Sequence, residues 1–307
     1  MHRHHHQQFQ DIGGLLALKR AQRISVCIPT LNEAETIGPI VACIRQQLME
    51  RVPLVDELLV IDSGSTDATR DQAAQAGAQV RLSADIAPES GTHLGKGENL
   101  WKALHCATGD LICYIDGDIR NFHAGFVTGL LGPLLSDPSV DYVKAFYERP
   151  LSHGDDLHPS GGGRVSEILI RPLLSLFYPE LSAVLQPLSG EYAARRPLLE
   201  SLAFPTGYGV EIAHLIDLAA AGKLAHVAQT DLEQRVHRNR SDAELGRMAF
   251  ALLLVVLRRL ERDGKLSLTD PLPTLHRAWS FHGSDPREIL TSITEPERPP
   301  VRAGNEG

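Results

Sequence analysis

The segment Leu111–Arg120 reads Leu-Ile-Cys-Tyr-Ile-Asp-Gly-Asp-Ile-Arg, an apolar run that stops at two aspartates separated by one glycine. Five apolar residues rich in β-branched and aromatic side chains have the length of a buried strand. Ligands bind at the carboxyl ends of such strands in open α/β sheets. Asp116 and Asp118 would repel each other there unless a cation joined them, and Gly117 permits a tight turn and close ligand approach. The stretch therefore predicts a divalent-cation site at a strand end.

The residues before this stretch alternate between strand and helix patterns. We expect strands at Ile24–Ile28, Leu58–Ile61 and Gln79–Leu82. Each is followed by an expected helix, at Glu35–Glu50, Asp67–Gln75 and Glu98–Ala107 respectively. Strands that alternate with helices are typical of a parallel, doubly wound sheet. The fold class predicted from the pattern is therefore α/β.

The second half of the chain is less regular. We expect strands at Tyr142–Phe146 and Leu224–Ala228, and helices at Val165–Phe177, Tyr208–Ala221 and Ala243–Asp263. Pro172 must kink or restart the first of these helices, because proline cannot donate a helical hydrogen bond. The composition of His153–Gly163 predicts a loop, and that of Glu295–Gly307 predicts disorder.

The composition excludes several classes of protein. Of the 307 residues, 43% are apolar and 22% charged, as in an ordinary globular protein, and the formal charge of −8 argues against a nucleic-acid binder. The longest apolar run, Ala249–Leu257, is too short to span a bilayer, so we expect no membrane partner. Four cysteines without a Cys-x-x-Cys pair, and no signal peptide, predict a cytoplasmic location. The histidine-rich start could bind metal like a purification tag, but we expect a frayed, functionally silent terminus.

Three further motifs lie at the starts of expected helices. Pro29-Thr-Leu-Asn-Glu33 and Asp62-Ser-Gly-Ser-Thr-Asp67 follow two neighbouring strands, and each alone is an acceptable turn with a helix cap. Together they favour a nucleotide crevice at the strand ends. Gly95-Lys-Gly97 lacks the spacing of a P-loop. Its lysine could meet phosphate at a helix N-terminus, or the motif could be a flexible surface turn.

In this order the motifs resemble those of nucleotide-sugar glycosyltransferases with the GT-A fold, whose Rossmann-like sheet is mixed. More narrowly, the chain resembles the retaining glucosyl-3-phosphoglycerate synthases and their mannosyl relatives. The resemblance covers about Arg23 to Asn239. The narrower match rests on four later motifs, which are Gly161-Gly-Gly-Arg-Val-Ser166, Leu188-Ser-Gly-Glu-Tyr192, Gly207-Tyr-Gly-Val-Glu211 and His237-Arg-Asn239.

The resemblance implies a role for particular residues. Those that bind the nucleotide sugar would be Pro29, Leu31, Asn32, Glu33, Ser63, Lys96, Asp116, Gly117, Leu188, Tyr208 and Glu211. Asp118 and His237 would ligate Mg²⁺ or Mn²⁺ together with the donor diphosphate. The acceptor would contact Gly163, Arg164, Val165, Ser166 and Asn239. The residues closest to the chemistry would be Asp118, Glu211 and Leu188.

The residues alone leave some of these roles open. Nothing in its spacing from Asp118 makes His237 a ligand, and only the resemblance does so. Arg164 follows three glycines and could grip a carboxylate or phosphate in bidentate fashion, or it could be a solvated arginine in a mobile loop. Ser166 stands where the family pattern leads us to expect threonine, but the hydroxyl is retained.

The function predicted from the motifs and the resemblance is that of a metal-dependent hexosyltransferase. We expect transfer from UDP-glucose to the 2-hydroxyl of 3-phosphoglycerate with retention, giving glucosyl-3-phosphoglycerate. The alternatives are a mannosyl-3-phosphoglycerate synthase that uses GDP-mannose and a non-catalytic nucleotide-sugar binding protein. A homodimer is also expected. The expected division is an N-terminal segment (1–22), a GT-A catalytic domain (23–240), a helical C-terminal extension (241–294) and a disordered tail (295–307).

Overall fold

The computed structural model describes residues 1–149, 151–153, 156–158, 163–236, 241–282 and 285–301. Its centre is an eight-stranded mixed sheet in the order β1-β11-β6-β9-β5-β2-β3-β4. Strand β9 is antiparallel to both β5 and β6, and the other neighbours are parallel. The strands are β1 His2–His5, β2 Ile24–Thr30, β3 Glu57–Asp62, β4 Gln79–Leu82, β5 Leu111–Tyr114, β6 Tyr142–Glu148, β9 Tyr192–Arg195 and β11 Val227–Gln234.

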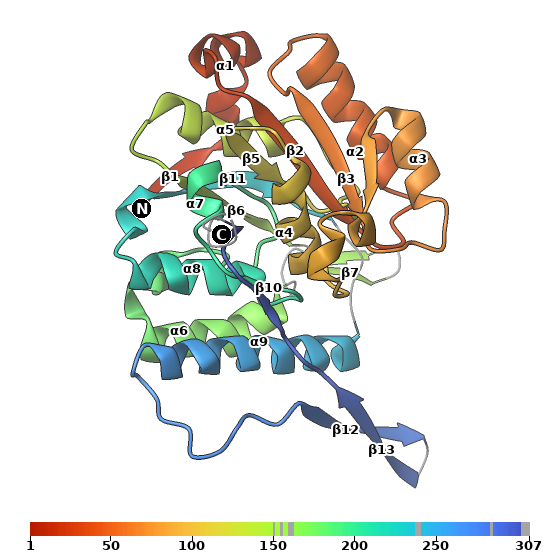
Figure 1. Ribbon diagram of the computed structural model, residues 1–307, viewed down its shortest axis with the longest axis vertical. Coiled ribbons are helices and arrows are strands. Elements are labelled where there is room, and N and C mark those ends of the chain that lie inside the picture. Colours follow the sequence, from red (N-terminus) through yellow and green to blue (C-terminus); the bar gives the residue numbers. More distant parts are fainter. Residues whose placement is uncertain (150, 154–155, 159–162, 237–240, 283–284, 302–307) are drawn as a thin grey trace.

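Helices cover both faces of this sheet (Figure 1). The helices that pack on one face are α1 Ile12–Lys19, α2 Ile37–Ile44 and α5 Gly125–Ser136. Those on the other face are α4 Lys96–Cys106, α7 Arg196–Leu199 and α8 Val210–Ala220. Beyond α8, the helices α6 Arg171–Phe177 and α9 Asp242–Arg262 build a third apolar cluster. Two π-helical turns, Arg45–Glu50 and Ser166–Ile170, extend α2 and precede α6, and shorter 3₁₀ turns connect other elements.

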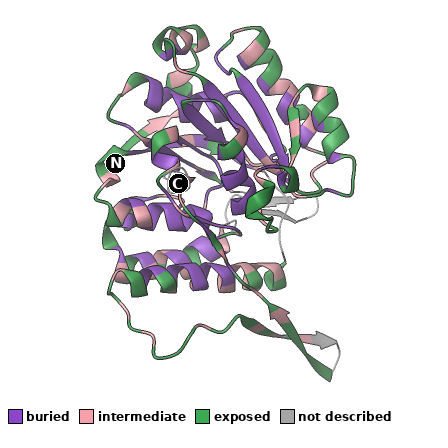
Figure 2. Ribbon diagram, in the orientation of Figure 1, coloured by how far each residue is buried: buried purple, intermediate pink, exposed green. Residues whose placement is uncertain are grey.

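Burial on both faces explains the apolar run before the aspartates. Leu111 and Cys113 of β5 face the α2 and α5 side, whereas Ile112 and Tyr114 face the α4 side. A strand covered on both faces needs no polar alternation, so its sequence is continuously apolar. The buried interior of the sheet is visible in Figure 2. The α/β prediction is confirmed, with the expected strands present and mostly extended by one or two residues.

Three predicted boundaries were wrong. Strand β2 does not stop before Pro29 but continues to Thr30. The pairing of β5 with β2 ends at Tyr114, which lies opposite Cys27. Pro29 lies beyond this last pair, so β5 does not require a hydrogen bond from the N–H that proline lacks. Residues 224–228 begin with a 3₁₀ turn, and the strand is the longer β11. The expected loop at 153–163 contains part of a small hairpin, β7 Leu151–His153 with β8 Asp156–His158.

Both ends of the chain are more ordered than predicted. The start is not frayed, because β1 pairs in parallel with β11 and forms one edge of the main sheet. The C-terminal extension is not purely helical, because α9 is followed by the hairpin β12 Leu275–His282 and β13 Asp285–Ser292, which extends from the body of the molecule (Figure 1). The domain boundary at 240 and 241 stays a prediction.

The predicted disorder of the tail was wrong over 295–301. Strand β14, Glu297–Arg298, pairs with β10, Phe204–Pro205. Arg298 is buried and donates two hydrogen bonds to the buried carboxylate of Glu98, each of 2.7 Å. Trp101 Nε1 also donates to the carbonyl of Pro299. None of the helices in the described part of the chain has the length and apolar content needed to cross a membrane.

Candidate active site

The loops that follow β2 and β3 are joined by hydrogen bonds. Thr30 Oγ1 donates to Asp62 Oδ2 at 3.0 Å, and Asn32 N donates to Ser65 Oγ at 2.8 Å. Asn32 has φ +59° and its side-chain oxygen accepts from Thr66 N at 2.9 Å. The Ser63 N–H donates to the carbonyl of Thr30. The two motifs predicted to form one crevice therefore lie together, and part of their polarity is used to hold the turns.

Gly117 packs directly against the first of these loops. A Cβ at this position would lie 3.0 Å from Thr30 Cγ2 and 3.3 Å from the carbonyl oxygen of Pro29. Thr36 Oγ1 donates to the Gly117 carbonyl at 2.6 Å. The aspartate pair is therefore fixed against the Pro29–Glu33 motif, and Leu31 of that motif is half exposed at the edge.

The Gly-Lys-Gly motif is not a flexible surface turn. A Cβ on Gly95 or Gly97 would overlap backbone oxygens of Thr206 or Pro205. Gly97 N donates to the carbonyl of Gly207 at 3.2 Å. Because both residues lack a Cβ, the first turn of α4 can pack against the segment before α8.

This packing places Lys96 between two carboxylates. Its ammonium lies 2.5 Å from Asp116 Oδ1 and 2.8 Å from Glu211 Oε1, and its side chain is largely buried. Burial alone would lower the pKa of Lys96, but Asp116, Glu211 and Glu191 together raise this pKa well above its usual value. Lys96 is therefore a fixed cation at the carboxyl end of β5.

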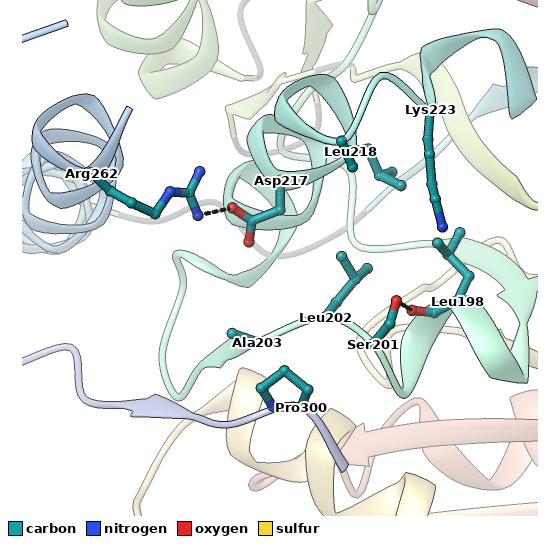
Figure 3. Close-up of a pocket in the computed structure, with 10 residues that line it drawn as sticks. Leu198, Ser201, Leu202, Ala203, Asp217, Leu218, Lys223, Arg262 and Pro300 are labelled. Atoms are coloured by element: carbon teal, nitrogen blue, oxygen red, sulfur yellow. Dashed lines mark hydrogen bonds and ion pairs between the residues drawn. The ribbon is translucent and has the colours of Figure 1, made fainter. Parts of the chain in front are cut away.

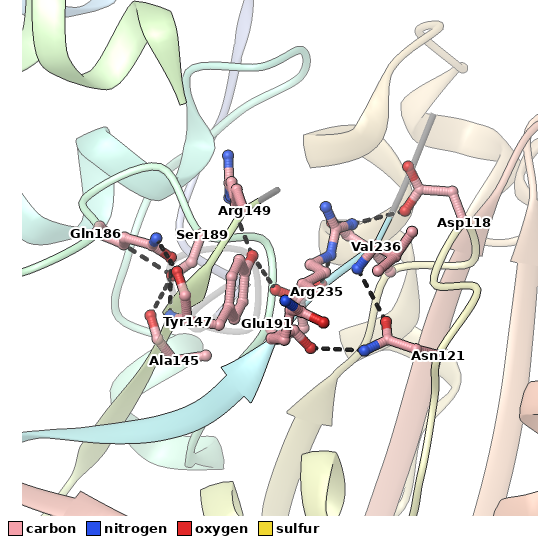
Figure 4. Close-up of polar contacts among 12 residues, drawn as sticks. Asp118, Asn121, Ala145, Tyr147, Arg149, Gln186, Ser189, Glu191, Arg235 and Val236 are labelled. Atoms are coloured by element: carbon pink, nitrogen blue, oxygen red, sulfur yellow. Dashed lines mark hydrogen bonds and ion pairs between the residues drawn. The ribbon is translucent and has the colours of Figure 1, made fainter. Parts of the chain in front are cut away.

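A second cation, Arg235, joins the two aspartates, and Figure 4 shows its contact with Asp118. Its guanidinium follows β11 and is almost fully buried. One nitrogen lies 2.9 Å from Asp116 Oδ2 and 2.6 Å from Asp118 Oδ1, and Nε lies 2.9 Å from Glu191 Oε1. Tyr147 OH donates to Glu191 Oε2 at 2.6 Å. A guanidinium of the protein itself therefore joins the two aspartates and offsets part of their repulsion.

The charges of this centre do not cancel. Six ionisable side chains meet here and form the acidic centre: Lys96, Arg235, Asp116, Asp118, Glu191 and Glu211. Two cations against four carboxylates leave two negative charges when all are ionised. Burial alone would raise the pKa of Asp116, but Lys96 and Arg235 lower it below its usual range. Burial raises the pKa of Glu191. The oxygen-rich, negative surroundings of Asp118 suit a hard divalent cation.

The segment Leu188–Tyr192 is brought to the same centre by a glycine. A Cβ on Gly190 would overlap the carboxylate of Asp116 and the ammonium of Lys96. Leu188, two residues earlier, is partly buried. On the opposite side of Lys96, Glu211 lies in the first turn of α8, and Tyr208 before it is half exposed. These three residues were predicted to face the transferred sugar.

Four of the five predicted acceptor residues, Gly163 to Ser166, lie together in the segment before α6. Gly163 has φ +81°, and no atom of the described residues lies within 4 Å of where its Cβ would be, while Val165 and Ser166 are buried beside α6. Arg164 forms an ion pair with Asp242, the first residue of α9. The predicted ligands His237 and Asn239 lie outside the described residues.

Two residues of the centre had no role in the sequence-based prediction. Glu191 lies inside a quoted motif, but glutamates are common and nothing marked it as buried. Arg235 precedes His237 by two residues, and no spacing rule connects it with Asp116. Strand β11 reaches the aspartates only through the sheet order, which no local pattern reveals.

A cavity elsewhere has no residue in common with this centre. It has a volume of about 260 Å³ and lies between α7, α8 and the end of α9 (Figure 3). Its charged lining residues are Asp217, Lys223 and Arg262, and Arg262 is already paired with Asp217 at 2.5 Å. The acidic centre, not this cavity, is the candidate active site.

A model of glycosyl transferase family 2 matches residues 25–177. The chain is 50% identical over 299 residues to the glucosyl-3-phosphoglycerate synthase of Petrotoga mobilis, with 97% of this chain and 92% of that protein covered. It is 46% identical over 272 residues to the enzyme of the same name from Mycobacterium tuberculosis, with 87% and 83% covered.

Solved structures give the same result. The crystal structure of the Mycobacterium tuberculosis glucosyl-3-phosphoglycerate synthase with Mn²⁺, UDP and phosphoglyceric acid has a TM-score of 0.87, 40% sequence identity and 99% coverage of both chains. A structure of that enzyme with Mg²⁺ and UDP has a TM-score of 0.86 and 39% identity, also with 99% of both chains covered.

The mixed sheet and the family match define a glycosyltransferase with the GT-A fold. Within that class, the chain belongs to the glucosyl-3-phosphoglycerate synthase family. The family predicted from the motifs is thereby confirmed.

Proposed function

We propose that the chain transfers glucose from UDP-glucose to the 2-hydroxyl of 3-phosphoglycerate with retention, in the presence of Mg²⁺ or Mn²⁺. The product is glucosyl-3-phosphoglycerate. The observation that carries this proposal is the buried contact of Lys96 with Asp116 and Glu211 beside Asp118, in a chain of this family. Solved relatives contain UDP-glucose and phosphoglyceric acid, which are the donor and acceptor proposed here.

The donor is assigned to the edge formed by β2, β3 and β5. Pro29, Leu31, Asn32, Glu33 and Ser63 hold the uridine in this proposal. Their positions at the ends of β2 and β3 support it, because ligands of open α/β sheets bind at such edges. Exposure of Leu31 leaves an apolar surface available to a base.

The divalent cation is assigned to Asp118 and His237, with the diphosphate supplying further oxygens. When bound, the cation offsets the charge that develops on the leaving diphosphate. Asp118 is partly exposed, which allows access from solvent. Asp118 Oδ1 accepts from the Arg235 guanidinium, so the cation would bind through the second carboxylate oxygen, Oδ2.

Glu211 is assigned to the sugar hydroxyls together with Leu188 and Tyr208, not to nucleophilic attack. Its carboxylate is paired with the Lys96 ammonium at 2.8 Å, which reduces its reactivity toward carbon. Retention then follows from substitution on the face of the sugar that the diphosphate leaves. In this step the leaving diphosphate oxygen takes the proton of the acceptor hydroxyl.

The acceptor is assigned to Gly163, Arg164, Val165, Ser166 and Asn239. Arginine suits a ligand that carries both a carboxylate and a phosphate, because it can bind each in bidentate fashion. Its present partner, Asp242, is highly exposed, so the ion pair is easily exchanged for a bound anion. The homodimer and the cytoplasmic location stay predictions.

The decisive experiment is a screen of donors against acceptors. UDP-glucose and GDP-mannose are each offered with 3-phosphoglycerate or unphosphorylated glycerate, in Mg²⁺, Mn²⁺ or EDTA, and products are identified by mass spectrometry and NMR. We expect glucosyl-3-phosphoglycerate with an α-linkage from UDP-glucose, and none in EDTA. Faster transfer from GDP-mannose would establish the mannosyl alternative. Tight UDP-glucose binding without product would make the chain a nucleotide-sugar binding protein.

A further inference from the structure

The end of β1 and the end of β11 bring two histidines and a glutamate together. One possible ligand atom of each of His5, His6 and Glu233 lies within 4.8 Å of the other two. None of these residues belongs to the acidic centre. Two imidazoles and one carboxylate form a set that holds Zn²⁺ in sites where water takes the fourth position.

The separations already approach those of a coordinated ion. His6 Nε2 lies 3.2 Å and His5 Nε2 lies 3.6 Å from Glu233 Oε1. Zinc bonds of about 2.0–2.1 Å at tetrahedral angles separate neighbouring ligand atoms by about 3.3 Å. The His6–Glu233 separation already fits this value, and the His5–Glu233 separation exceeds it by about 0.3 Å.

The buried position of His6 suits a metal ligand. Its side chain is 7% exposed, and its Nε2 atom makes no hydrogen bond of acceptable geometry among the described residues. Its ring lies between those of His5 and His123, with centroids 5.0 Å from each. A buried ring nitrogen without a hydrogen bond is uncommon in proteins, and this one lies 3.2 Å from Glu233 Oε1.

Glu233 reaches the histidines through an irregular backbone. The register of β11 with β6 shifts between Asp231 and Gln234, and Glu233 has φ +67°. A side chain other than glycine in this conformation costs about 1–3 kcal/mol, and such residues cluster at ligand sites. The bulge places the Glu233 carboxylate beside β1, where Gln7 Nε2 also donates to it at 2.5 Å.

We propose that His5, His6 and Glu233 bind one zinc-like transition-metal ion, separate from the cation of the transfer reaction. The ion joins the first strand of the chain to β11. Ligation through His5 Nε2 moves the ring proton to Nδ1, so the 3.2 Å contact from Gln7 N to Nδ1 is given up. Two residues after Glu233 comes Arg235, so the ion also fixes the backbone that positions this arginine.

The test measures bound zinc in the full-length protein. Wild type, His5→Gln and Glu233→Gln are stripped with EDTA, loaded with Zn²⁺, desalted and analysed by elemental mass spectrometry and calorimetric titration. The acidic centre is identical in all of these proteins, so any zinc that it binds contributes equally to the zinc content of each and does not affect the difference between them. We expect the variants to bind one ion fewer per chain, or to bind it at least about tenfold more weakly. Added Zn²⁺ should raise the unfolding temperature of the wild type but not of the variants.

The matched control is the double variant His2→Gln with His4→Gln, which removes two histidines of the same strand outside the cluster. It should retain the wild-type stoichiometry. Equal zinc binding by all four proteins, or an equal loss in the double variant, would overturn the proposal in favour of tag-like chelation. Far-UV circular dichroism in EDTA identifies any variant that fails to fold. His5→Gln, at a more exposed position, decides the question if Glu233→Gln is unstable.

Discussion

At the residue scale, Arg235 is the most consequential side chain of the centre. It is nearly fully buried and contacts three carboxylates. Arg235→Met leaves Asp116, Asp118 and Glu191 without this cation, and the loss of one member of a buried ion pair typically costs about 3–5 kcal/mol. We expect a decrease of that size in the free energy of unfolding, measured in urea.

The matched control for this prediction is Arg120→Met. Arg120 pairs with Glu35, but both side chains are well exposed, and such pairs contribute about 1 kcal/mol or less. Equal stability of the two variants would contradict the contribution assigned to Arg235. Metal in the solution is chelated, so that a bound cation cannot replace the missing guanidinium.

Arg164 provides a second prediction at this scale. If Arg164 binds the acceptor, Arg164→Ala should raise KM for 3-phosphoglycerate by about tenfold or more, because a charged hydrogen bond contributes about 1.5–3 kcal/mol. KM for UDP-glucose should change little. Arg277→Ala, which removes an exposed arginine paired with Glu288, is the control. A larger change in the donor constant would place Arg164 elsewhere.

Single residues show where prediction from sequence succeeds. Lys96, Asp116 and Glu211 were assigned to one site, and the structure brings them into contact. Their motifs combine glycine with charge beside strand or helix ends, which is a local signal. Arg235 carries no such signal, because its two aspartate partners are more than a hundred positions away and its role depends on sheet order. The functional roles of these residues remain predictions.

At the scale of elements, the start of α4 depends on close backbone packing. Gly97→Ala introduces a Cβ that overlaps the Pro205 carbonyl oxygen, so α4 must move and carry Lys96 with it. Overpacking of this kind usually costs about 1–3 kcal/mol. We expect a loss of stability in that range, and a larger fractional loss of glucosyl transfer, measured by urea unfolding and steady-state kinetics.

Gly38 of α2 offers the matched control. A Cβ there would meet its nearest neighbour, Gln72 Oε1, at 3.5 Å, which is an ordinary contact. Gly38→Ala should be neutral or stabilising by up to about 1 kcal/mol, because alanine favours helix. Similar losses in both variants would show that the close packing at Gly97 is not the cause.

A buried histidine of α8, His214, makes the free energy of unfolding depend on pH. Burial lowers the pKa of His214 to about 3, and its ring packs against Phe204 with centroids 4.5 Å apart. Between pH 6.5 and 3, the unfolded chain binds more protons at this position, so the free energy of unfolding falls as pH falls, by up to about 1.4 kcal/mol per unit. Above this range the contribution is complete.

His214→Phe keeps the aromatic packing and removes the titrating group. Its free energy of unfolding should therefore fall less steeply than that of the wild type between about pH 7 and about pH 5, measured in urea. The control is His93→Gln, at an exposed position, which should keep the wild-type slope. Parallel slopes for wild type and His214→Phe would assign the acid sensitivity to other groups.

Elements with strong periodicity were predicted well, and those built by distant pairing were not. The interior strands and α9 have continuous or helical apolar patterns, which indicate their type. Strand β1 consists of histidines and arginine, so only its pairing with β11 makes it a strand. The hairpin β12–β13 has mostly exposed side chains, as Figure 2 shows, and therefore little hydrophobic pattern to detect.

At the scale of the whole molecule, the end of the chain completes the core. Removal of 295–307 deletes Arg298 and leaves Glu98 buried without its partner. This should lower the free energy of unfolding by about 3–5 kcal/mol. A chain that ends at Val301 keeps these contacts and should differ from the full chain by less than about 0.5 kcal/mol. Thermal and urea unfolding of the two truncations compare them, and equal stability would contradict the role of the tail.

The bond between Glu98 and Arg298 spans 200 positions. A ribosome that adds about 5–20 residues per second needs roughly 10–40 s to pass from one to the other. During that interval α4 cannot settle into its final position without burying the Glu98 carboxylate in the absence of Arg298. Because α4 begins with Lys96, we expect a growing chain to bind no donor until Arg298 has been made and can reach Glu98. Synthesis of the first 240 residues, which include every proposed donor-binding residue, is therefore not sufficient for activity.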